Sequence, residues 1–274
     1  MSRAAPTSVP IVLYHSVTDR DDGPMRRYTL TPAAFGAHMR WVAEQGFSTL
    51  TVSEYAAARR GERALPDRPL LVTFDDGYAD FLDGAAPVPA DHGIRATLYV
   101  TTAPVGERRR GTIAGRPMLT WDELRQVGDL GVEVGGHGHD HASLDLLPPR
   151  EALRQVTTCK RLIEQRLGAE VRSFAYPHGH YSQRVREAVR AAGYSSACAV
   201  KNARSHPDDD LWALGRVMFE REDGVERLRA ACEGDLYPLS WRGERPRTRA
   251  WRVVRRVRRR VRPDTLTPPT TPGE

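Results

Sequence analysis

The chain has 274 residues, of which 40% are hydrophobic and only 3 are cysteines. This length and apolar content suit one large domain or two small ones, and they exclude a disulfide-stapled miniprotein and a fully disordered chain. The net charge of +6 is uneven, because the 11 Arg and 3 acidic residues from Trp241 onward give +8 and leave −2 for residues 1–241.

The start of the chain predicts a cytoplasmic protein. Residues 1–10 hold no apolar run of signal-peptide length, and no window approaches the roughly eighteen apolar residues of a membrane span. Cys159, Cys198 and Cys232 are odd in number and form no CxxC pair. We therefore expect inert thiols in a reducing compartment.

Hydrophobic periodicity and capping signals predict alternating strands and helices. Thr31-Pro32 is typical of a helix start, and Thr120 with Glu123 forms a capping-box pair. In chain order we expect a strand at 10–14, helices at 32–46 and 52–60, strands at 70–74 and 96–100, a surface loop of about eighteen residues, a helix from 120 to about 131, a strand at 132–134, a helix at 148–167, a strand at 172–176, a helix at 182–192, strands at 195–200 and 214–219, and a helix at 225–232. This alternation indicates parallel strands covered by helices, either as an open sheet or as a closed barrel.

Polar clusters follow three of these strands, at 75–77, 137–141 and 176–181. In both architectures the active site lies at the carboxyl ends of the strands, where these clusters fall. His137 and His141 share one side if their segment makes a helical turn, so both can reach one ion. Two histidines and a carboxylate are a common ligand set for catalytic zinc, and adjacent aspartates allow one to bind metal while the other acts as a base.

Each cluster alone has a simpler interpretation. Asp-Asp-Gly is more often a solvated turn, exposed histidine pairs are ordinary, and a Tyr-Pro-x-Gly-x-Tyr segment is usually only a loop. All three occur together here, each at the end of a strand, which favours an active site.

The clusters resemble the first three motifs of the polysaccharide deacetylases, carbohydrate esterase family four. The similar segments are 73–77, 137–141 and 172–181, within a core of residues 70–219. The resemblance implies an α/β fold with a distorted, incomplete (β/α) barrel of about seven parallel strands in residues 1–241. It also implies hydrolysis of the N-acetyl group of an amino sugar.

The resemblance assigns roles to the motif residues. It makes Asp75 the general base, with Arg172 holding it, and gives the backbone N–H of Tyr181 to the oxyanion. The expected ligands of a divalent metal, Zn²⁺ or alternatively Co²⁺, Ni²⁺ or Mn²⁺, are Asp76, His137 and His141. The residues expected to line the sugar site are Tyr176, Pro177, His178, Gly179 and His180.

The sequence departs from the family pattern at two places. A late Leu-x-His motif, which usually carries the general acid, is absent, and the last histidine is His206. The Tyr14-His15 pair resembles the early motif of the poly-N-acetylglucosamine deacetylases, so we assign the acid role to His15; the alternative is a strand-end histidine satisfied by backbone. Gly138 stands where the family prefers Ser or Thr, which weakens the expectation of tight metal binding.

Other polar residues near the motifs receive weaker assignments. His139 would point away from the shared face of His137 and His141, toward solvent or behind the ligands. Arg216 could lie near the site, but such an arginine more often makes a structural pair. Trp121 and Trp212 suit the core better than a sugar platform.

The tail, residues 242–274, is strongly basic. Positions 250, 254, 257 and 261 give a narrow apolar stripe in an Arg-rich helix, which could lie on an anionic membrane surface or remain solvated. Nucleic-acid binding is disfavoured because no binding fold accompanies the charge. Residues 263–274 are rich in Pro and Thr and should be disordered.

The first functional hypothesis is a cytoplasmic metal-dependent deacetylase of an N-acetylhexosamine unit, free or peripheral at the inner membrane face. Without a secretion signal, a mature cell-wall polymer is a poor substrate candidate. One alternative is a carbohydrate-binding protein with a degraded site, suggested by Gly138 and the missing late histidine. Another is a metal amidase that acts on a non-sugar amide.

Overall fold

The computed structural model describes residues 8–20, 22–108, 113–234 and 254–255. The chain separates into two compact units, Met1–Arg242 and Gly243–Glu274. Most of the second unit, including the predicted basic helix and the Pro/Thr-rich end, lies outside the described residues. No helix within the described ranges is long and apolar enough to cross a membrane.

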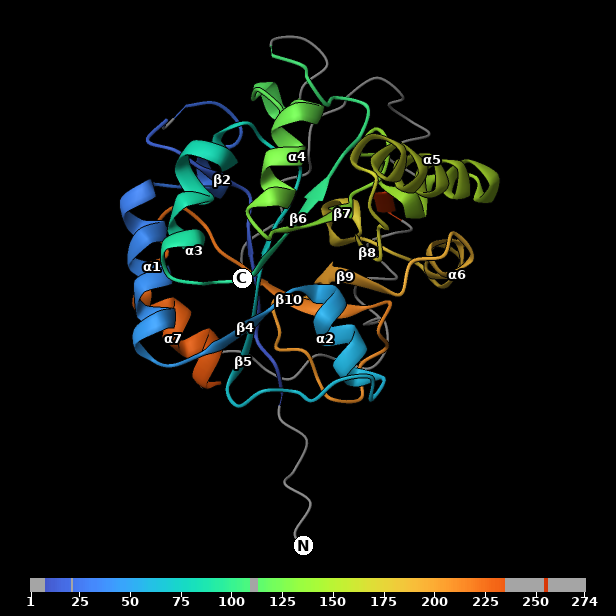
Figure 1. Cartoon of the computed structure of the whole chain (residues 1–274). Helices are drawn as coiled ribbons and strands as arrows, with labels where there is room; N and C mark the ends of the chain where they lie inside the picture. Colours follow the sequence, from blue (N-terminus) through green and yellow to red (C-terminus); the bar gives the residue numbers. More distant parts are fainter. Residues whose placement is uncertain (1–7, 21, 109–112, 235–253, 256–274) are drawn as a thin grey trace, which may run out of the picture. The chain divides into compact units, whose positions relative to one another are not determined.

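Seven parallel strands close into a barrel at the centre of the first unit (Figure 1). They are β1 (Ile11–Tyr14), β5 (Pro69–Phe74), β6 (Ala96–Val100), β7 (Glu133–Gly136), β8 (Ser173–Ala175), β9 (Ser196–Val200) and β10 (Leu214–Met218). The barrel closes at β1, where Val12 pairs with Val217 on one side and with Val72 on the other. This confirms the predicted parallel barrel and removes the open-sheet alternative.

Residues along each strand alternate between the barrel interior and the helix layer, as the period of two in a strand requires. Leu71 of β5 packs with Ile11 and Leu214 in the interior cluster. Val72 and Phe74 of the same strand belong instead to the large cluster beneath the helices. A strand that is buried on both faces has a continuous run of apolar residues in its sequence. These strands could therefore be predicted.

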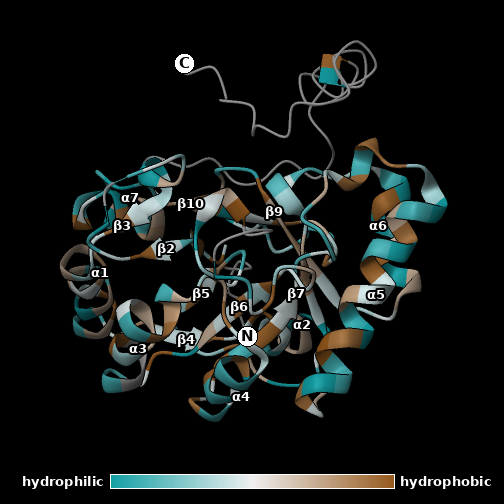
Figure 2. Cartoon of the chain, turned by 90° about the horizontal axis from the view of Figure 1, so that it is seen from above, coloured by the Kyte–Doolittle hydropathy of each residue, from teal (hydrophilic) through white to brown (hydrophobic). Residues whose placement is uncertain are grey.

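Helices surround the strands, with their apolar faces inward (Figure 2). They are α1 (Pro32–Glu44), α3 (Pro87–Asp91), α4 (Trp121–Asp129), α5 (Pro149–Leu167), α6 (Gln183–Ala191) and α7 (Val225–Glu233). The predicted caps form, since Thr31 accepts a hydrogen bond from the Ala34 N–H and Thr120 completes a capping box with Glu123. Gly168 ends α5 in the left-handed conformation that glycine adopts most easily.

The short helix α2 (Val52–Arg59) closes the amino-terminal end of the barrel. It follows β4 (Ser48–Leu50), which pairs with the first half of β5. The Val52 N–H donates to Thr97 Oγ1, and the Ser53 N–H donates to Glu133 at the start of β7. Because α2 occupies this end, the opposite, carboxyl end is left for the site.

Several short elements were not predicted from the sequence. They are β2 (Ser16–Val17), β3 (Thr29–Leu30), β4, α3, the π-helix η2 (Phe81–Ala85) and the 3₁₀ turns η1 (Arg26–Tyr28), η3 (Ile113–Gly115), η4 (Leu144–Leu146) and η5 (Pro177–Gly179). Each is too short to show a hydrophobic period. The predicted loop after β6 returns to the site, because the Leu119 N–H donates to the Gly77 carbonyl.

Candidate functional site

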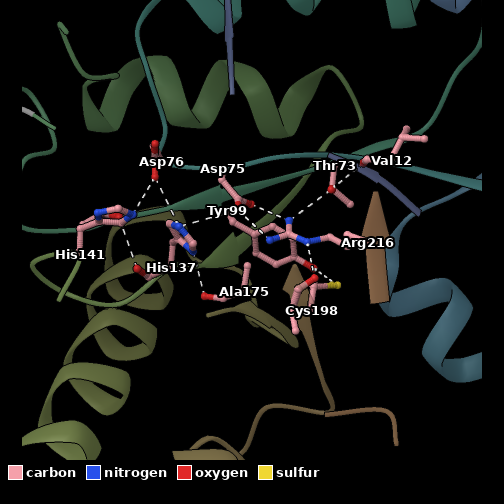
Figure 3. A network of polar contacts seen from close by, with 12 residues as sticks. Val12, Thr73, Asp75, Asp76, Tyr99, His137, His141, Ala175, Cys198 and Arg216 are labelled. Carbon is pink, nitrogen blue, oxygen red and sulfur yellow. Dashed lines mark hydrogen bonds and ion pairs between the residues drawn. The ribbon is translucent and has the colours of Figure 1, made fainter. Parts of the chain in front are cut away.

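Asp75 and Asp76 leave the end of β5 in different directions (Figure 3). Asp76 has φ 77° and Gly77 has φ 88°, so the chain turns sharply directly after Asp75. The turn is held where Leu119 donates to the Gly77 carbonyl and Thr101 donates to the Asp76 carbonyl. As a result, the Asp75 carboxylate faces Arg216, whereas the Asp76 carboxylate faces two histidines.

The segment from His137 to His141 brings both imidazoles to Asp76. His137 Nε2 lies 3.4 Å from Asp76 Oδ1, and His141 Nε2 lies 3.1 Å from the same oxygen. The segment is not the helical turn that the spacing suggested, because Gly138 has φ 81° and His141 has φ 60°. Although the segment is not helical, its two residues with positive φ bring both imidazoles to the same side of the loop. The ring centroids are 5.1 Å apart.

These three side chains fit a divalent cation. Their candidate ligand atoms all lie within 4.8 Å of one another. His137 Nδ1 lies 2.8 Å from the Ala175 carbonyl, which can only accept, so Nδ1 carries the hydrogen and Nε2 is free to bind metal. Asp76 Oδ1 is buried and faces both Nε2 atoms, but it accepts no well-formed hydrogen bond from the described residues. Two nitrogens and one carboxylate oxygen form a ligand set that suits zinc.

Arg216, and not Arg172, holds Asp75. The Arg216 guanidinium donates from both terminal nitrogens to the two Asp75 oxygens, each at 2.7 Å, and is fully buried. Arg172 precedes β8 at the other end of the barrel, where its side chain is 60% exposed and pairs with Glu170. The expectation that Arg172 holds Asp75 is therefore wrong, because a residue before a parallel strand cannot reach the strand's carboxyl end.

The charges around the two aspartates keep both ionised. Burial alone would raise the pKa of Asp75, but Arg216 and His137 outweigh it, and the pKa lies below its usual range. Burial likewise opposes ionisation of Asp76, yet His141 and His137 hold its pKa well below normal. The carboxylates in turn raise the pKa of His137 against the effect of burial. Asp75 can therefore accept a proton as a base.

His15 follows β1, beside the two aspartates. Its ring packs at 5.4 Å from that of Tyr28, and its Nδ1 is buried with no hydrogen-bond partner in the described ranges. Burial lowers the pKa of His15, while Asp76 and Asp75 oppose this effect. The alternative was that backbone groups satisfy the His15 ring. The buried Nδ1 without a hydrogen-bond partner does not agree with it.

In the third cluster, residues 176–181, only the two histidines lie where their side chains can contact a sugar. His178 lies edge-on against His141, with ring centroids 4.5 Å apart, and His180 follows at 6.2 Å from His178. The His178 side chain is exposed, yet the desolvating surroundings of this end of the barrel and the neighbouring His141 and His180 lower its pKa. His178 is therefore neutral at pH 7.

The other residues of this cluster support the fold around the two histidines. Tyr176 is fully buried and its hydroxyl donates to the Trp212 carbonyl, so the expectation that its side chain contacts sugar is wrong. Pro177 is buried too, and Gly179 has φ 69° in a place where a Cβ would lie 2.5 Å from Val200 Cβ. The Tyr181 ring stacks on Tyr176, and the role of its backbone N–H stays a prediction.

Sequence reasoning missed two residues that act behind the ligands. Arg216 was considered as a residue near the site, but a structural pair was preferred, although an arginine in a buried apolar strand needs a carboxylate partner. Gln155 of α5 accepts hydrogen bonds from the backbone of His139 and Asp140. Its place within a long amphipathic helix gave no such signal.

Comparison with known proteins identifies relatives of one kind. Residues 62–197 match the family model described as polysaccharide deacetylase. YxkH of Bacillus subtilis, whose name assigns it to the polysaccharide deacetylases, is 26% identical over 212 residues, which cover 77% of this chain and 71% of that protein. The poly-beta-1,6-N-acetyl-D-glucosamine N-deacetylase of Escherichia coli K12 is 27% identical over 123 residues, or 42% of this chain but only 18% of that enzyme.

Solved structures share the fold. The deacetylase PplD of Streptococcus pyogenes, in complex with acetate, superposes with a TM-score of 0.75 at 19% identity, covering 83% of this chain and 99% of its own. IcaB from Ammonifex degensii gives a TM-score of 0.72 at 24% identity, covering 83% of this chain and 97% of its own. At these identities the similarity establishes the barrel architecture alone.

Proposed function

We propose that the chain is a polysaccharide deacetylase, the family whose model residues 62–197 match, and that it hydrolyses the N-acetyl group of an N-acetylhexosamine unit in a metal-dependent reaction. The observation that carries the proposal is the convergence of Asp76, His137 and His141 within 4.8 Å. Zn²⁺ is the cation that this donor set suits best, with Co²⁺, Ni²⁺ and Mn²⁺ as alternatives.

Asp75 is the proposed general base. An acetamide is a poor electrophile, and a divalent cation bound by the three ligands would polarise its carbonyl and lower the pKa of water. Asp75 lies beside these ligands, with Oδ2 at 3.8 Å from His137 Nε2. It accepts a proton from the attacking water, and the bidentate Arg216 fixes its orientation.

His15 is the proposed general acid. When the amide bond breaks, the departing nitrogen must gain a proton to leave as an amine. Burial lowers the pKa of His15, but the negative charges of Asp76 and Asp75 oppose this and favour the protonated form that the acid role requires. The proton on His15 goes to the sugar nitrogen, and acetate and a free amino sugar result. We assign a backbone N–H, that of Tyr181 by its place in the motif, to the developing oxyanion.

The proposed substrate belongs to the class named for the Escherichia coli relative, a β-linked N-acetylglucosamine polymer or a related glycoconjugate. The imidazole of His178 lies beside His141, and His180 lies next to His178, where both can contact sugar hydroxyls. We place the reaction in the cytoplasm.

The direct test is release of acetate from N-acetylglucosamine oligomers, before and after removal of metal with a chelator. We expect activity to disappear with the chelator and to return with Zn²⁺. Asp75→Asn should lower kcat by at least about 100-fold, since a positioned base contributes 10²- to 10⁴-fold. Activity that survives both treatments contradicts the mechanism, whereas glycan binding without turnover under every metal would favour a binding protein.

A further inference from the structure

Gln155 lies against the loop that joins the two candidate metal-binding histidines. Its Oε1 accepts hydrogen bonds from the backbone N–H of His139, at 3.1 Å, and of Asp140, at 3.0 Å. Its Nε2 donates to Asp140 Oδ2 at 2.6 Å and to Glu151 Oε1 at 3.2 Å. The residue is only 1% exposed, so both halves of the amide are used in a place that water does not reach.

The loop needs such support because its own backbone is not a regular element. His141 and Gly138 both have positive φ, and a left-handed conformation at a non-glycine residue is unfavourable. The loop is also held by the residues that follow β6, because the Ala103 N–H donates to the His139 carbonyl at 2.7 Å and Thr102 Oγ1 lies 2.9 Å from His139 Nδ1. The loop is therefore held between α5 and the residues that follow β6.

The helix that carries Gln155 is a firm support. α5 has 19 residues, and its buried face packs into the main core. Val156, Cys159 and Ile163 on that face are all fully buried. Gln155 directly precedes Val156, so its backbone is fixed by the packing of the helix. Its side chain can therefore hold the loop in one position.

We propose that Gln155 is a positioning residue of the metal centre, which fixes residues 139–140 so that His137 and His141 aim their Nε2 atoms at Asp76. The inference rests on the metal-dependent reaction proposed above. Only an amide serves both halves of the contact. A glutamate could not donate to Asp140 and would add a third carboxylate beside Asp140 and Glu151, and a methionine would fill the space without bonding either backbone N–H.

The test compares Gln155→Met and Gln155→Glu with the wild-type protein, and uses Gln165→Met as the matched control. Gln165 lies on the exposed face of the same helix, where Arg161 donates to it. The quantity measured is the Zn²⁺ dissociation constant, by competition with a chromogenic chelator. We expect both Gln155 variants to bind Zn²⁺ about 10- to 100-fold more weakly, the range for residues that orient metal ligands, and Gln165→Met to match wild type within about twofold.

Thermal unfolding of the metal-free proteins separates positioning from general stability. A lower Tm for Gln155→Met with an unchanged Zn²⁺ dissociation constant overturns the inference. A measurement on the wild-type protein covers the case in which the variants do not fold: in the metal-free protein the amide hydrogens of His139 and Asp140 should exchange slowly, and rapid exchange of both also overturns it.

The outcomes for the two proposals can be told apart. A wild-type protein that binds Zn²⁺ but releases no acetate contradicts the proposed deacetylase, while weaker Zn²⁺ binding by Gln155→Met would still support the positioning role. Zn²⁺ binding and turnover that are both unaffected in Gln155→Met contradict the positioning role alone. A wild-type protein that binds no divalent cation contradicts both.

Discussion

The Asp75–Arg216 pair is a buried ion pair between the residue that follows β5 and the middle of β10. Taking both charges out of water costs several kcal/mol per ion, and the bidentate geometry offsets this only while both partners are present. Arg216 also donates to Thr73 Oγ1 at 3.3 Å, which in turn donates to the Val12 carbonyl. The arginine thus links Asp75 to three strands of the barrel, β1, β5 and β10.

Exchange of this arginine should affect both stability and turnover. We expect Arg216→Met to reduce the free energy of unfolding by about 3–5 kcal/mol, because the Asp75 charge stays buried without a partner. The same change raises the pKa of Asp75 and removes its orientation, so kcat should also fall. Urea unfolding and acetate release measure the two effects.

Arg172→Met is the control for the corrected assignment. Its exposed pair with Glu170 should contribute no more than about 1 kcal/mol, and turnover should remain within about twofold of wild type. A larger loss of turnover in Arg172→Met than in Arg216→Met would restore the assignment suggested by sequence.

His38 is a buried histidine outside the site that links stability to pH. It lies in α1, fully buried, with its Nδ1 3.0 Å from the Tyr14 hydroxyl. Burial lowers its pKa to about 4, whereas the unfolded chain titrates near 6.5. The unfolded state therefore binds more protons between these pH values, so stability is full above about 6.5 and falls as the pH drops toward 4.

Between pH 7 and pH 4, His38 should reduce the free energy of unfolding by about 3 kcal/mol. A variant without this histidine should lack that part of the loss. We predict that His38→Gln is less stable at pH 7 and shows a correspondingly flatter dependence of unfolding free energy on pH. His92→Gln, at an exposed position, should keep the wild-type slope. Equal slopes in His38→Gln and wild type would disprove the linkage.

At the scale of elements, patterns long enough to repeat were predictable. The helices with caps and a continuous apolar face, such as α1 and α5, and the fully apolar strands, such as β5, lie where their sequences indicated. β4 and the plugging role of α2 were not predictable, because Ser48–Leu50 is only three residues long and its pairing with β5 depends on tertiary contacts.

The site shows the same division. The residues of the three motifs could be placed at one end of the barrel because parallel strands bring their carboxyl ends together. The partner of Asp75 could not be identified this way. Arg172 lies before β8, whereas Arg216 lies in the middle of β10 and reaches Asp75 through its long side chain. The role of Gln155 could not be predicted either, because its hydrogen bonds join a helix to a loop that is distant in sequence.

One carboxylate gathers most of the polar contacts between α2 and the barrel strands. Glu133 accepts hydrogen bonds from the Ser53 N–H and hydroxyl, and from the hydroxyls of Thr97 and Ser173. We predict that Glu133→Leu lowers the free energy of unfolding by at least about 2 kcal/mol, because it leaves these donors without an acceptor.

The Zn²⁺ dissociation constant and KM of Glu133→Leu should stay at wild-type values, because Glu133 begins β7 whereas His137 follows its end. Glu187→Leu, on the exposed surface of α6, is the control and should change stability by less than about 0.5 kcal/mol. A change in Zn²⁺ affinity with unchanged stability would show that Glu133 acts on the site and not on α2.

At the scale of the whole molecule, charge is separated along the chain. Residues 1–241 carry a net charge of −2, and the 11 Arg of the tail give it +8. A cationic segment gains about 1 kcal/mol per Lys or Arg near an anionic bilayer, and the gain falls with salt. We predict that the tail draws the protein to vesicles that contain phosphatidylserine and leaves it free of neutral phosphatidylcholine vesicles.

Deletion of residues 242–274 should abolish this binding while turnover of soluble N-acetylglucosamine oligomers stays the same, because the motif residues all precede the deleted segment. Sedimentation with vesicles at low and high salt measures the binding. Replacement of Val254, Val257 and Val261 by Asp separates insertion of an apolar stripe from attraction of charge alone: an amphipathic helix loses more binding than the three added negative charges account for in a matched variant with Thr265, Thr267 and Thr270 replaced by Asp. Equal vesicle binding by the full chain and the deletion variant would show that the tail has no part in membrane attachment.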